Sequence, residues 1–102
     1  MKVHIPFLKQ FREPMLTGKK TMTSRMKRYG KKGDTFEAFG STFVILGVSK
    51  VPLGDVVYLH YEEEGFTQRK DLIQCWEKLH PRKGYVPQQE VWVHTFHKEV
   101  TA

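Results

Sequence analysis

The sequence predicts a small α+β barrel of short, mostly antiparallel strands. Three observations support this fold class: apolar residues alternate over short stretches, turn residues separate those stretches, and strands do not alternate with helices as they would in a parallel sheet. The 102 residues leave room for one hydrophobic core. We therefore expect a single domain over residues 1–102, with five or six strands and two helices.

The N-terminal part of the chain is expected to form strand, helix and strand in turn. Residues 3–7 alternate between apolar and other side chains, which is typical of a short strand. Pro14 is suited to the first turn of a short helix, and Gly18 is suited to its C-cap. Residues 21–26 are β-branched or polar and are predicted to be extended.

The strongest β signal lies in the middle of the chain. After a turn over residues 30–34, residues 36–39 and 42–51 are predicted to form an antiparallel hairpin connected by Gly40-Ser41. The second strand is apolar on both faces, as in the interior of a barrel or sandwich. One face is expected to carry Phe43, Ile45 and Gly47, and the other Val44, Leu46 and Val48.

The C-terminal half is predicted to contain one long helix and one closing strand. Residues 56–61 fit either a strand or a short helix. Thr67 is a good N-cap for a helix that continues to about His80, before Pro81. One face of that helix carries the apolar residues Leu72, Ile73, Trp76 and Leu79. Residues 91–96 form the expected last strand.

Positive charge is concentrated in one segment. The chain has 17 Lys and Arg against 11 Asp and Glu, which gives a net charge of +6. Seven of the basic residues fall within one acid-free segment: Lys19, Lys20, Arg25, Lys27, Arg28, Lys31 and Lys32. The residues interleaved with them include Thr21, Thr23, Ser24 and Tyr29. Basic groups bind phosphates, while hydroxyls and aromatic rings contact sugars and bases, so the segment indicates an RNA or nucleotide interface. A solvated loop is the alternative.

Other side chains give little reason to expect a metal, a cofactor or a membrane. Cys75 is the only cysteine, and we expect it to be a buried, inert thiol. His94 and His97 are three residues apart, which places them on opposite faces of a strand, and His94 is expected in the core. The first residues lack the apolar run of a signal peptide, and no stretch has the 18 or so apolar residues of a membrane span, so we expect neither. These features predict a cytoplasmic protein without cofactors.

Two tryptophans and one tyrosine are candidates for stacking on a base. Trp76 and Trp92 lie in apolar stripes and are expected in the core, together with Phe43. Tyr29 is set among lysines and is the better stacking candidate.

One segment resembles a known family. Residues 16–25 (Leu-Thr-Gly-Lys-Lys-Thr-Met-Thr-Ser-Arg) are similar to the G-x-K-T-x-T-x-R signature of ASCH domains. Further matches follow in the family's order: Gly33-Asp34, residues 36–39, Glu64-Gly65-Phe66, Trp76 and His94-Thr95-Phe96. The resemblance extends from about Phe7 to Phe96. It implies a PUA-like β-barrel with a cleft that is lined by the first segment and binds RNA or nucleotides.

The resemblance also implies a catalytic triplet. One branch of the family consists of bacterial amidohydrolases that remove the acetyl group from N4-acetylcytidine, and their functional residues match Lys20, Thr23 and Glu64. In a regular strand Lys20 would point away from Thr23, so their pairing requires a turn or bulge after Gly18. We expect the positive charge around Lys20 to lower its pKa. The simpler alternative is an ion pair between Lys20 and Glu64, with Thr23 bonded to the backbone.

Three functions remain open from the sequence. The first is an RNA- or nucleotide-binding module whose cleft takes a nucleobase or nucleoside. The second is a hydrolase, either an amidohydrolase of acetylated cytidine or a ribonuclease, using Lys20, Thr23 and Glu64. The third is a module that binds a protein partner. The expected ligand contacts are Lys19, Thr21, Ser24, Arg25, Lys27, Arg28, Tyr29 and Lys31.

Overall fold

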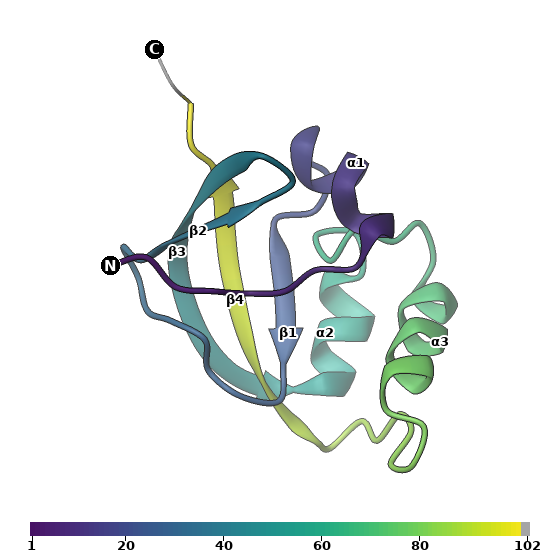
Figure 1. The fold of residues 1–102 in the computed structure, drawn as a ribbon. Helices are drawn as coiled ribbons and strands as arrows, with labels where there is room; N and C mark the ends of the chain where they lie inside the picture. The colour runs from purple at the N-terminus through teal and green to yellow at the C-terminus, as the bar shows by residue number, and fades with distance from the viewer. Residues whose placement is uncertain (101–102) are drawn as a thin grey trace.

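The computed structural model describes residues 1–100 and has the predicted α+β class (Figure 1). Its elements are, in order, the 3-10 helix η1 (Lys9–Phe11), α1 (Arg12–Leu16), β1 (Met22–Arg25), β2 (Thr35–Ala38), β3 (Ser41–Pro52), α2 (Leu53–His60), α3 (Arg69–Leu79) and β4 (Glu90–Lys98). Within the described residues the expected numbers are wrong: the sheet has four strands rather than five or six, and there are three α-helices rather than two.

The four strands form one curled antiparallel sheet in the order β1-β4-β3-β2. The last strand of the chain, β4, is therefore central and pairs with β3 on one side and β1 on the other. Helices α2 and α3 lie together beyond the β1 side of the sheet in Figure 1, and the N-terminal segment crosses the opening of the curl. None of the helices in residues 1–100 is long and apolar enough to cross a membrane.

The strand predicted over residues 3–7 does not form. The segment makes a single parallel bridge, between Lys2 and Thr35, and the backbone N–H of Val3 donates to the carbonyl of Thr35 at 2.8 Å. Pro6 has no N–H with which to continue a ladder, so alternation of apolar residues is not enough here. This loss accounts for one of the missing strands.

The predicted hairpin is present, with its turn one residue earlier than expected. Pairing of Ala38 with Ser41 leaves Phe39 and Gly40 as a two-residue loop. Both loop residues have positive φ, 52° and 79°, which is the requirement of a type I′ turn. Gly40 meets this requirement without strain because it has no Cβ.

The faces predicted for β3 are wrong beyond residue 45, because the strand contains a β-bulge. The register with β4 shifts between Ile45 and Gly47, so Leu46 is left out of the pairing and is 46% exposed. After the bulge the alternation reverses, and Val48 packs on the same cluster as Ile45 rather than on the opposite face. Strict alternation along the sequence cannot predict this change.

The long helix begins later than predicted. Gln68 is at the N-cap position instead of Thr67, whose hydroxyl is 3.5 Å from the carboxylate of Asp71 and caps no backbone group. Leu72 is buried as expected, but Leu79, in the last turn, is 52% exposed. The ambiguous residues 56–61 belong largely to a helix, α2.

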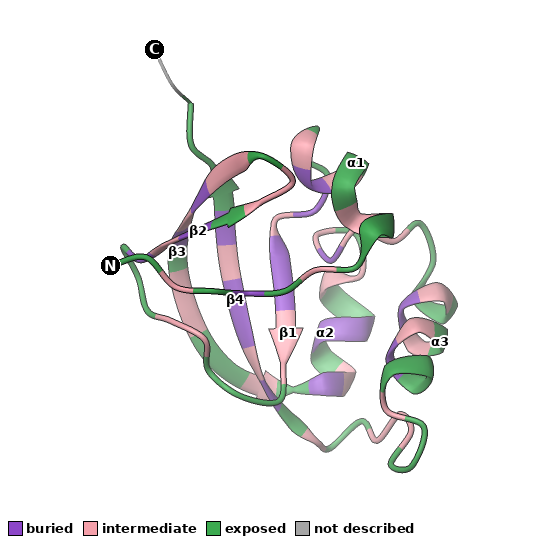
Figure 2. Cartoon of the chain, viewed as in Figure 1, coloured by how far each residue is buried: buried purple, intermediate pink, exposed green. Residues whose placement is uncertain are grey.

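Two hydrophobic clusters form the core, and buried residues are prominent along β4 and on α2 in Figure 2. The helix-side cluster lies between the sheet and helices α2 and α3 and consists of Met22, Leu53, Val56, Val57, Leu72, Trp76, Val91 and Val93. The barrel cluster consists of Ile5, Met15, Phe36, Phe43, Ile45 and Phe96. Burial of both Phe43 and Trp76 is therefore confirmed.

Candidate functional site

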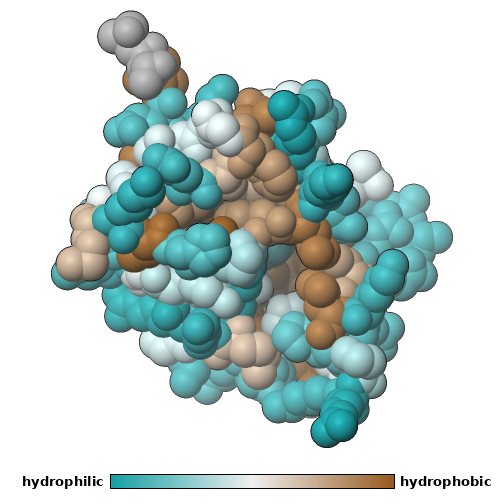
Figure 3. Space-filling view, in the orientation of Figure 1, coloured by the Kyte–Doolittle hydropathy of each residue, from teal (hydrophilic) through white to brown (hydrophobic). Residues whose placement is uncertain are grey.

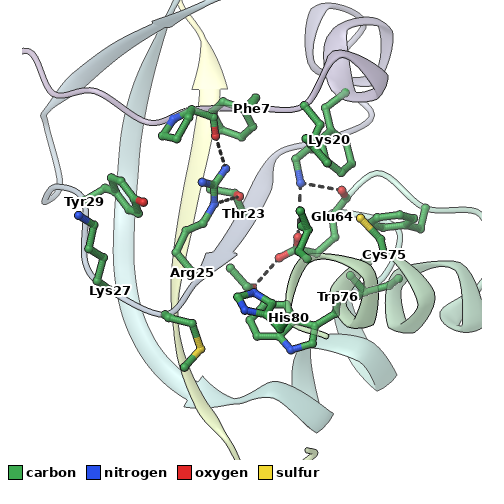
Figure 4. Close-up of a pocket in the computed structure, with 18 residues that line it drawn as sticks. Phe7, Lys20, Thr23, Arg25, Lys27, Tyr29, Glu64, Cys75, Trp76 and His80 are labelled. Atoms are coloured by element: carbon green, nitrogen blue, oxygen red, sulfur yellow. Dashed lines mark hydrogen bonds and ion pairs between the residues drawn. The ribbon is translucent and has the colours of Figure 1, made fainter. Parts of the chain in front are cut away.

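A cavity of about 540 Å³ lies between the N-terminal segment, β1 and α3. Figure 3 shows it as a hollow on one face of the molecule, with hydrophobic side chains along its border. Leu72 and Trp76 of the helix-side cluster line it, as do aromatic rings that pack against the barrel cluster. Polar groups from β1 and from the loop after α2 complete the lining. The close-up in Figure 4 shows these side chains converging from different elements.

The chain turns sharply before β1, and this turn directs Lys20 inward. Gly18 has a φ of +83° just after α1, and the backbone N–H of Lys20 donates to the carbonyl of Pro14 at 2.9 Å. Strand β1 begins only at Met22, so Lys20 is free of the strand's alternation. The irregularity that the sequence requires for a Lys20–Thr23 site is thus present, and Lys20 is only 2% exposed.

Three protein oxygens surround the amino group of Lys20. Its Nζ donates to the carbonyls of Met22 at 2.8 Å and Glu64 at 2.7 Å, and to Oε1 of Glu64 at 3.4 Å. It also lies 4.4 Å from the ring centroid of Phe11. An ammonium has three N–H donors and no acceptor, so three surrounding oxygens fit the charged form.

Burial lowers the pKa of Lys20, and the neighbouring Glu64 carboxylate opposes that change. Arg25 lowers the pKa as well, but less than burial does. The direction predicted from the sequence is therefore right, while its cause is desolvation rather than mainly the surrounding positive charge. Because only the charged amine has an N–H for each of the three oxygens, we assign Lys20 as an ammonium held by Glu64.

Glu64 connects Lys20 to Ser24. Glu64 is 4% exposed, and its carboxylate oxygen that does not face Lys20 accepts a hydrogen bond from the hydroxyl of Ser24 at 2.6 Å. Gly65 follows with a φ of +99°, and a Cβ there would lie 3.1 Å from Cβ of Lys20. A glycine beside Glu64 thus allows the loop to lie directly against the Lys20 side chain.

Thr23 and Arg25 form the second polar pair. Nε of Arg25 donates to Oγ1 of Thr23 at 3.0 Å, and an Nη donates to the carbonyl of Pro6 at 2.6 Å. Its guanidinium carbon lies 4.9 Å from the ring centroid of Phe7 and 5.6 Å from that of Tyr29. A guanidinium has five N–H groups, so these two bonds leave donors for a ligand.

The structure brings most of the predicted site residues together. Seven of them line the cavity: Lys20, Thr23, Ser24, Arg25, Lys27, Tyr29 and Glu64. Of the three remaining basic residues, Lys19 is exposed outside the cavity, whereas Arg28 and Lys31 border a second, shallower hollow of about 350 Å³ that shares Tyr29. Thr21 serves the fold instead, because its N–H donates to the carbonyl of Glu63 and its own carbonyl accepts from Phe96.

Sequence reasoning missed the apolar walls of the cavity. Phe7 and Phe11 line it from the N-terminal side, and Trp76 lines it from α3, where its ring lies 4.3 Å from that of His80. In the sequence these residues have the same pattern as core residues, so no signal distinguishes a cavity wall from a packed interior. Trp92, expected in the core, is only partly buried and lies beside the cations of Arg28 and Lys50.

Cys75 also borders the cavity and is half-buried rather than fully buried. Burial raises the pKa of its thiol, so the unreactive protonated form is favoured. Within residues 1–100 no three His, Cys, Asp or Glu side chains lie close enough together to hold a metal ion.

Solved structures with the same fold include a hypothetical protein, an ASCH domain and a protein described by the family model DUF984. The hypothetical protein PH0355 is 15% identical, with a TM-score of 0.73 over 97% of this chain and 100% of that chain. The ASCH domain from Lactobacillus crispatus JV V101 is 11% identical, with a TM-score of 0.65 over 95% and 79%. Protein EF3133 from Enterococcus faecalis V583 is 16% identical, with a TM-score of 0.64 over 88% and 67%.

The fold and the cavity define a small α+β domain with a curled sheet and a buried polar site. No family model and no curated protein matches the sequence. At 11–16% identity the structural likeness establishes the fold: this chain has the fold of an ASCH domain, which is the fold that the family resemblance implied.

Proposed function

We propose that this domain binds RNA or a nucleotide by enclosing one nucleobase in the cavity. The observation that carries the proposal is the composition of that cavity: aromatic rings of Phe7, Tyr29 and Trp76 on its walls, with buried polar groups between them. Its volume of about 540 Å³ falls in the range of small-molecule sites. A planar base with polar edges fits such surroundings.

Several groups in the cavity suit the recognition of a base. The aromatic rings offer faces on which a base can stack, which proteins use to hold unpaired bases. The free donors of Arg25 suit a base carbonyl, and the Ser24–Glu64 pair suits an exocyclic amine. Lys27, exposed at the edge with its Nζ 4.9 Å from the Tyr29 ring, is placed to meet a phosphate.

The test is binding of a labelled single-stranded RNA of mixed sequence, followed by fluorescence anisotropy at two salt concentrations. Tyr29→Ala should weaken binding by about fivefold to 150-fold, since loss of one stacked base costs about 1–3 kcal/mol. The matched control is Lys19→Ala, a basic residue outside the cavity, which should change the affinity less than threefold. Equal losses in both variants, or no binding by the parent, would contradict the proposal.

A second candidate function is hydrolysis of an acetylated cytidine. The observation that favours it is the hydrogen bond from Arg25 to Oγ1 of Thr23, because a cationic donor stabilises negative charge that develops on a nucleophilic hydroxyl. Lys20 and Glu64 lie in the same cavity. As an ammonium, Lys20 would act there as an electrostatic group. The Glu64 carboxylate would accept the proton of the Thr23 hydroxyl and return it to the amine of the departing cytidine, and water would then release acetate from Thr23.

The assay incubates the protein with N4-acetylcytidine and follows release of acetate. Thr23→Val and Glu64→Gln should abolish turnover, and Lys19→Ala should leave it unchanged. The RNA of the binding experiment, incubated in parallel, tests for strand cleavage. Base binding without turnover of either substrate would exclude the hydrolase and leave the binding function. Failure of both experiments would favour a module that binds a protein partner.

A further inference from the structure

His94 is fully buried at the centre of the sheet and bonds to the loop that carries Tyr29. It lies on β4 opposite Thr23 of β1 and Val48 of β3. Its Nε2 accepts a hydrogen bond from the backbone N–H of Tyr29 at 3.0 Å. Its Nδ1 has no hydrogen-bond partner in the part of the chain that the structure describes.

This hydrogen bond fixes the protonation state of the ring. A backbone N–H can donate to Nε2 only if that nitrogen has a free lone pair, so the ring is neutral and its proton is on Nδ1. A second proton would place an N–H of the imidazolium against the N–H of Tyr29. The hydrogen bond would then be replaced by a repulsive contact inside the fold.

The contact between His94 and Tyr29 also positions one wall of the cavity. The ring of Tyr29 lies edge-on to the ring of His94, with centroids 6.1 Å apart, and it also lines the cavity. Arg25 and Lys27 lie against the Tyr29 ring, at 5.6 Å and 4.9 Å. A movement of Tyr29 would therefore alter both the stacking face and the cations beside it.

The surroundings of His94 favour its neutral form. Burial lowers its pKa, and the positive charges of Arg25 on β1 and Arg28 in the following loop lower it further. The backbone carbonyls of Thr23 and Trp92 act in the opposite direction. The side chain opposite it on β3, Val48, is uncharged. The bond to Tyr29 is thus intact at neutral pH and is weakened by protonation in acid.

We propose that His94 is a positioning residue for the cavity: its neutral Nε2 anchors Tyr29, and protonation of the ring releases the aromatic wall and weakens ligand binding. The inference rests on the proposed function, because it assigns acid sensitivity to the same site. The structural part, the bond between His94 and Tyr29, is measurable without any ligand.

The experiment compares RNA binding between pH 7.5 and pH 5 in the parent and in His94→Gln, whose side-chain carbonyl accepts a hydrogen bond but does not titrate. The affinity of the parent should fall as the pH falls, by up to about tenfold per pH unit while one proton is taken up. His94→Gln should bind RNA within about twofold of the parent at pH 7.5. As the pH falls, its affinity should decrease less than that of the parent, because residue 94 no longer takes up a proton. The control is His97→Gln, an exposed histidine on the same strand, which should keep the parent's profile.

A second measurement uses the ¹⁵N-labelled parent protein without ligand. Nitrogen resonances of His94 should show Nε2 unprotonated at pH 7.5, and the Tyr29 amide should lose protection from exchange in acid. A protonated Nε2 at pH 7.5, or identical pH profiles for the parent and a folded His94→Gln, would overturn the proposal. If His94→Gln does not fold, the nitrogen resonances of the parent still show whether Nε2 of His94 is unprotonated and accepts the hydrogen bond from Tyr29. If no RNA binds at pH 7.5, the proposed function fails while the resonances still decide whether His94 anchors Tyr29.

Discussion

The barrel cluster and the cavity wall contain similar aromatic residues in different arrangements. In the barrel cluster the rings of Phe36 and Phe43 are stacked at 5.3 Å, and Phe96 meets both edge-on, so the rings pack against one another. On the other side of the molecule, Trp76 belongs to the helix-side cluster but also borders the cavity. The difference is that the rings of the barrel cluster are closed off by one another, whereas Trp76 also borders open space.

The largest expected effects come from truncating one ring in each region. Phe43→Ala and Trp76→Ala should each lower the free energy of unfolding by about 3–5 kcal/mol, as large-to-small changes in cores do. Only Trp76→Ala should also weaken RNA binding, measured at a temperature where both variants are folded. Urea denaturation gives the stabilities. If Trp76→Ala unfolds like the parent, or if Phe43→Ala impairs binding equally, the two regions do not differ in the way described.

The buried ion pair provides the next test. Lys20→Met leaves the Glu64 carboxylate buried without its cation, which should cost about 3–5 kcal/mol of stability. The double variant Lys20→Met/Glu64→Leu removes both charges and should recover most of that loss, because apolar pairs often replace buried ion pairs without net cost. A double variant as unstable as the single one would show that the pair is needed for more than mutual neutralisation.

Alanine substitutions at two glycines with similar φ angles distinguish the cost of backbone strain from the cost of a steric contact with Lys20. Gly65 has a φ of +99° and lies against Lys20, whereas Gly33 has a φ of +94° with nothing within 4 Å of an added Cβ. Substitution by alanine should cost about 1–3 kcal/mol at either position because of the positive φ. Gly65→Ala should cost more than Gly33→Ala, since Lys20 must also move. Equal decreases in the melting temperature of the two variants would mean that the loop around Gly65 is not closely packed on Lys20.

The smallest expected effect is a pH dependence of stability caused by His94. Burial places its pKa in the folded protein below the ordinary value of 6.5. The unfolded chain therefore takes up the proton first as the pH falls, which favours unfolding. The contribution of neutral His94 is complete above pH 6.5 and declines below it, by at most about 1.4 kcal/mol per pH unit. Thermal melts of His94→Gln should be less sensitive to pH in this range; a steeper dependence would contradict the burial effect.

Much of the fold was predictable because it depends on local patterns. The hairpin, α1, β1 and α3 follow from alternation, turn residues and helical spacing, and each lies within a few residues of its expected position. The strand predicted over residues 3–7 failed because Pro6 cannot continue a ladder. The faces of β3 were wrong after Leu46 because a bulge leaves no mark in an apolar run.

By itself, the sequence determined the α+β class, the basic segment and the residues that could meet at a site, since these depend on residue type and spacing. Only the tertiary structure decided which of them share a cavity. Lys20 and Glu64 are 44 residues apart, and their contact exists because the loop after α2 lies against the turn before β1. The apolar walls formed by Phe7, Phe11 and Trp76 were undecidable from sequence for a related reason. A ring that borders a cavity and a ring in a packed core are equally apolar, and only the packing of distant segments determines whether space is left beside it.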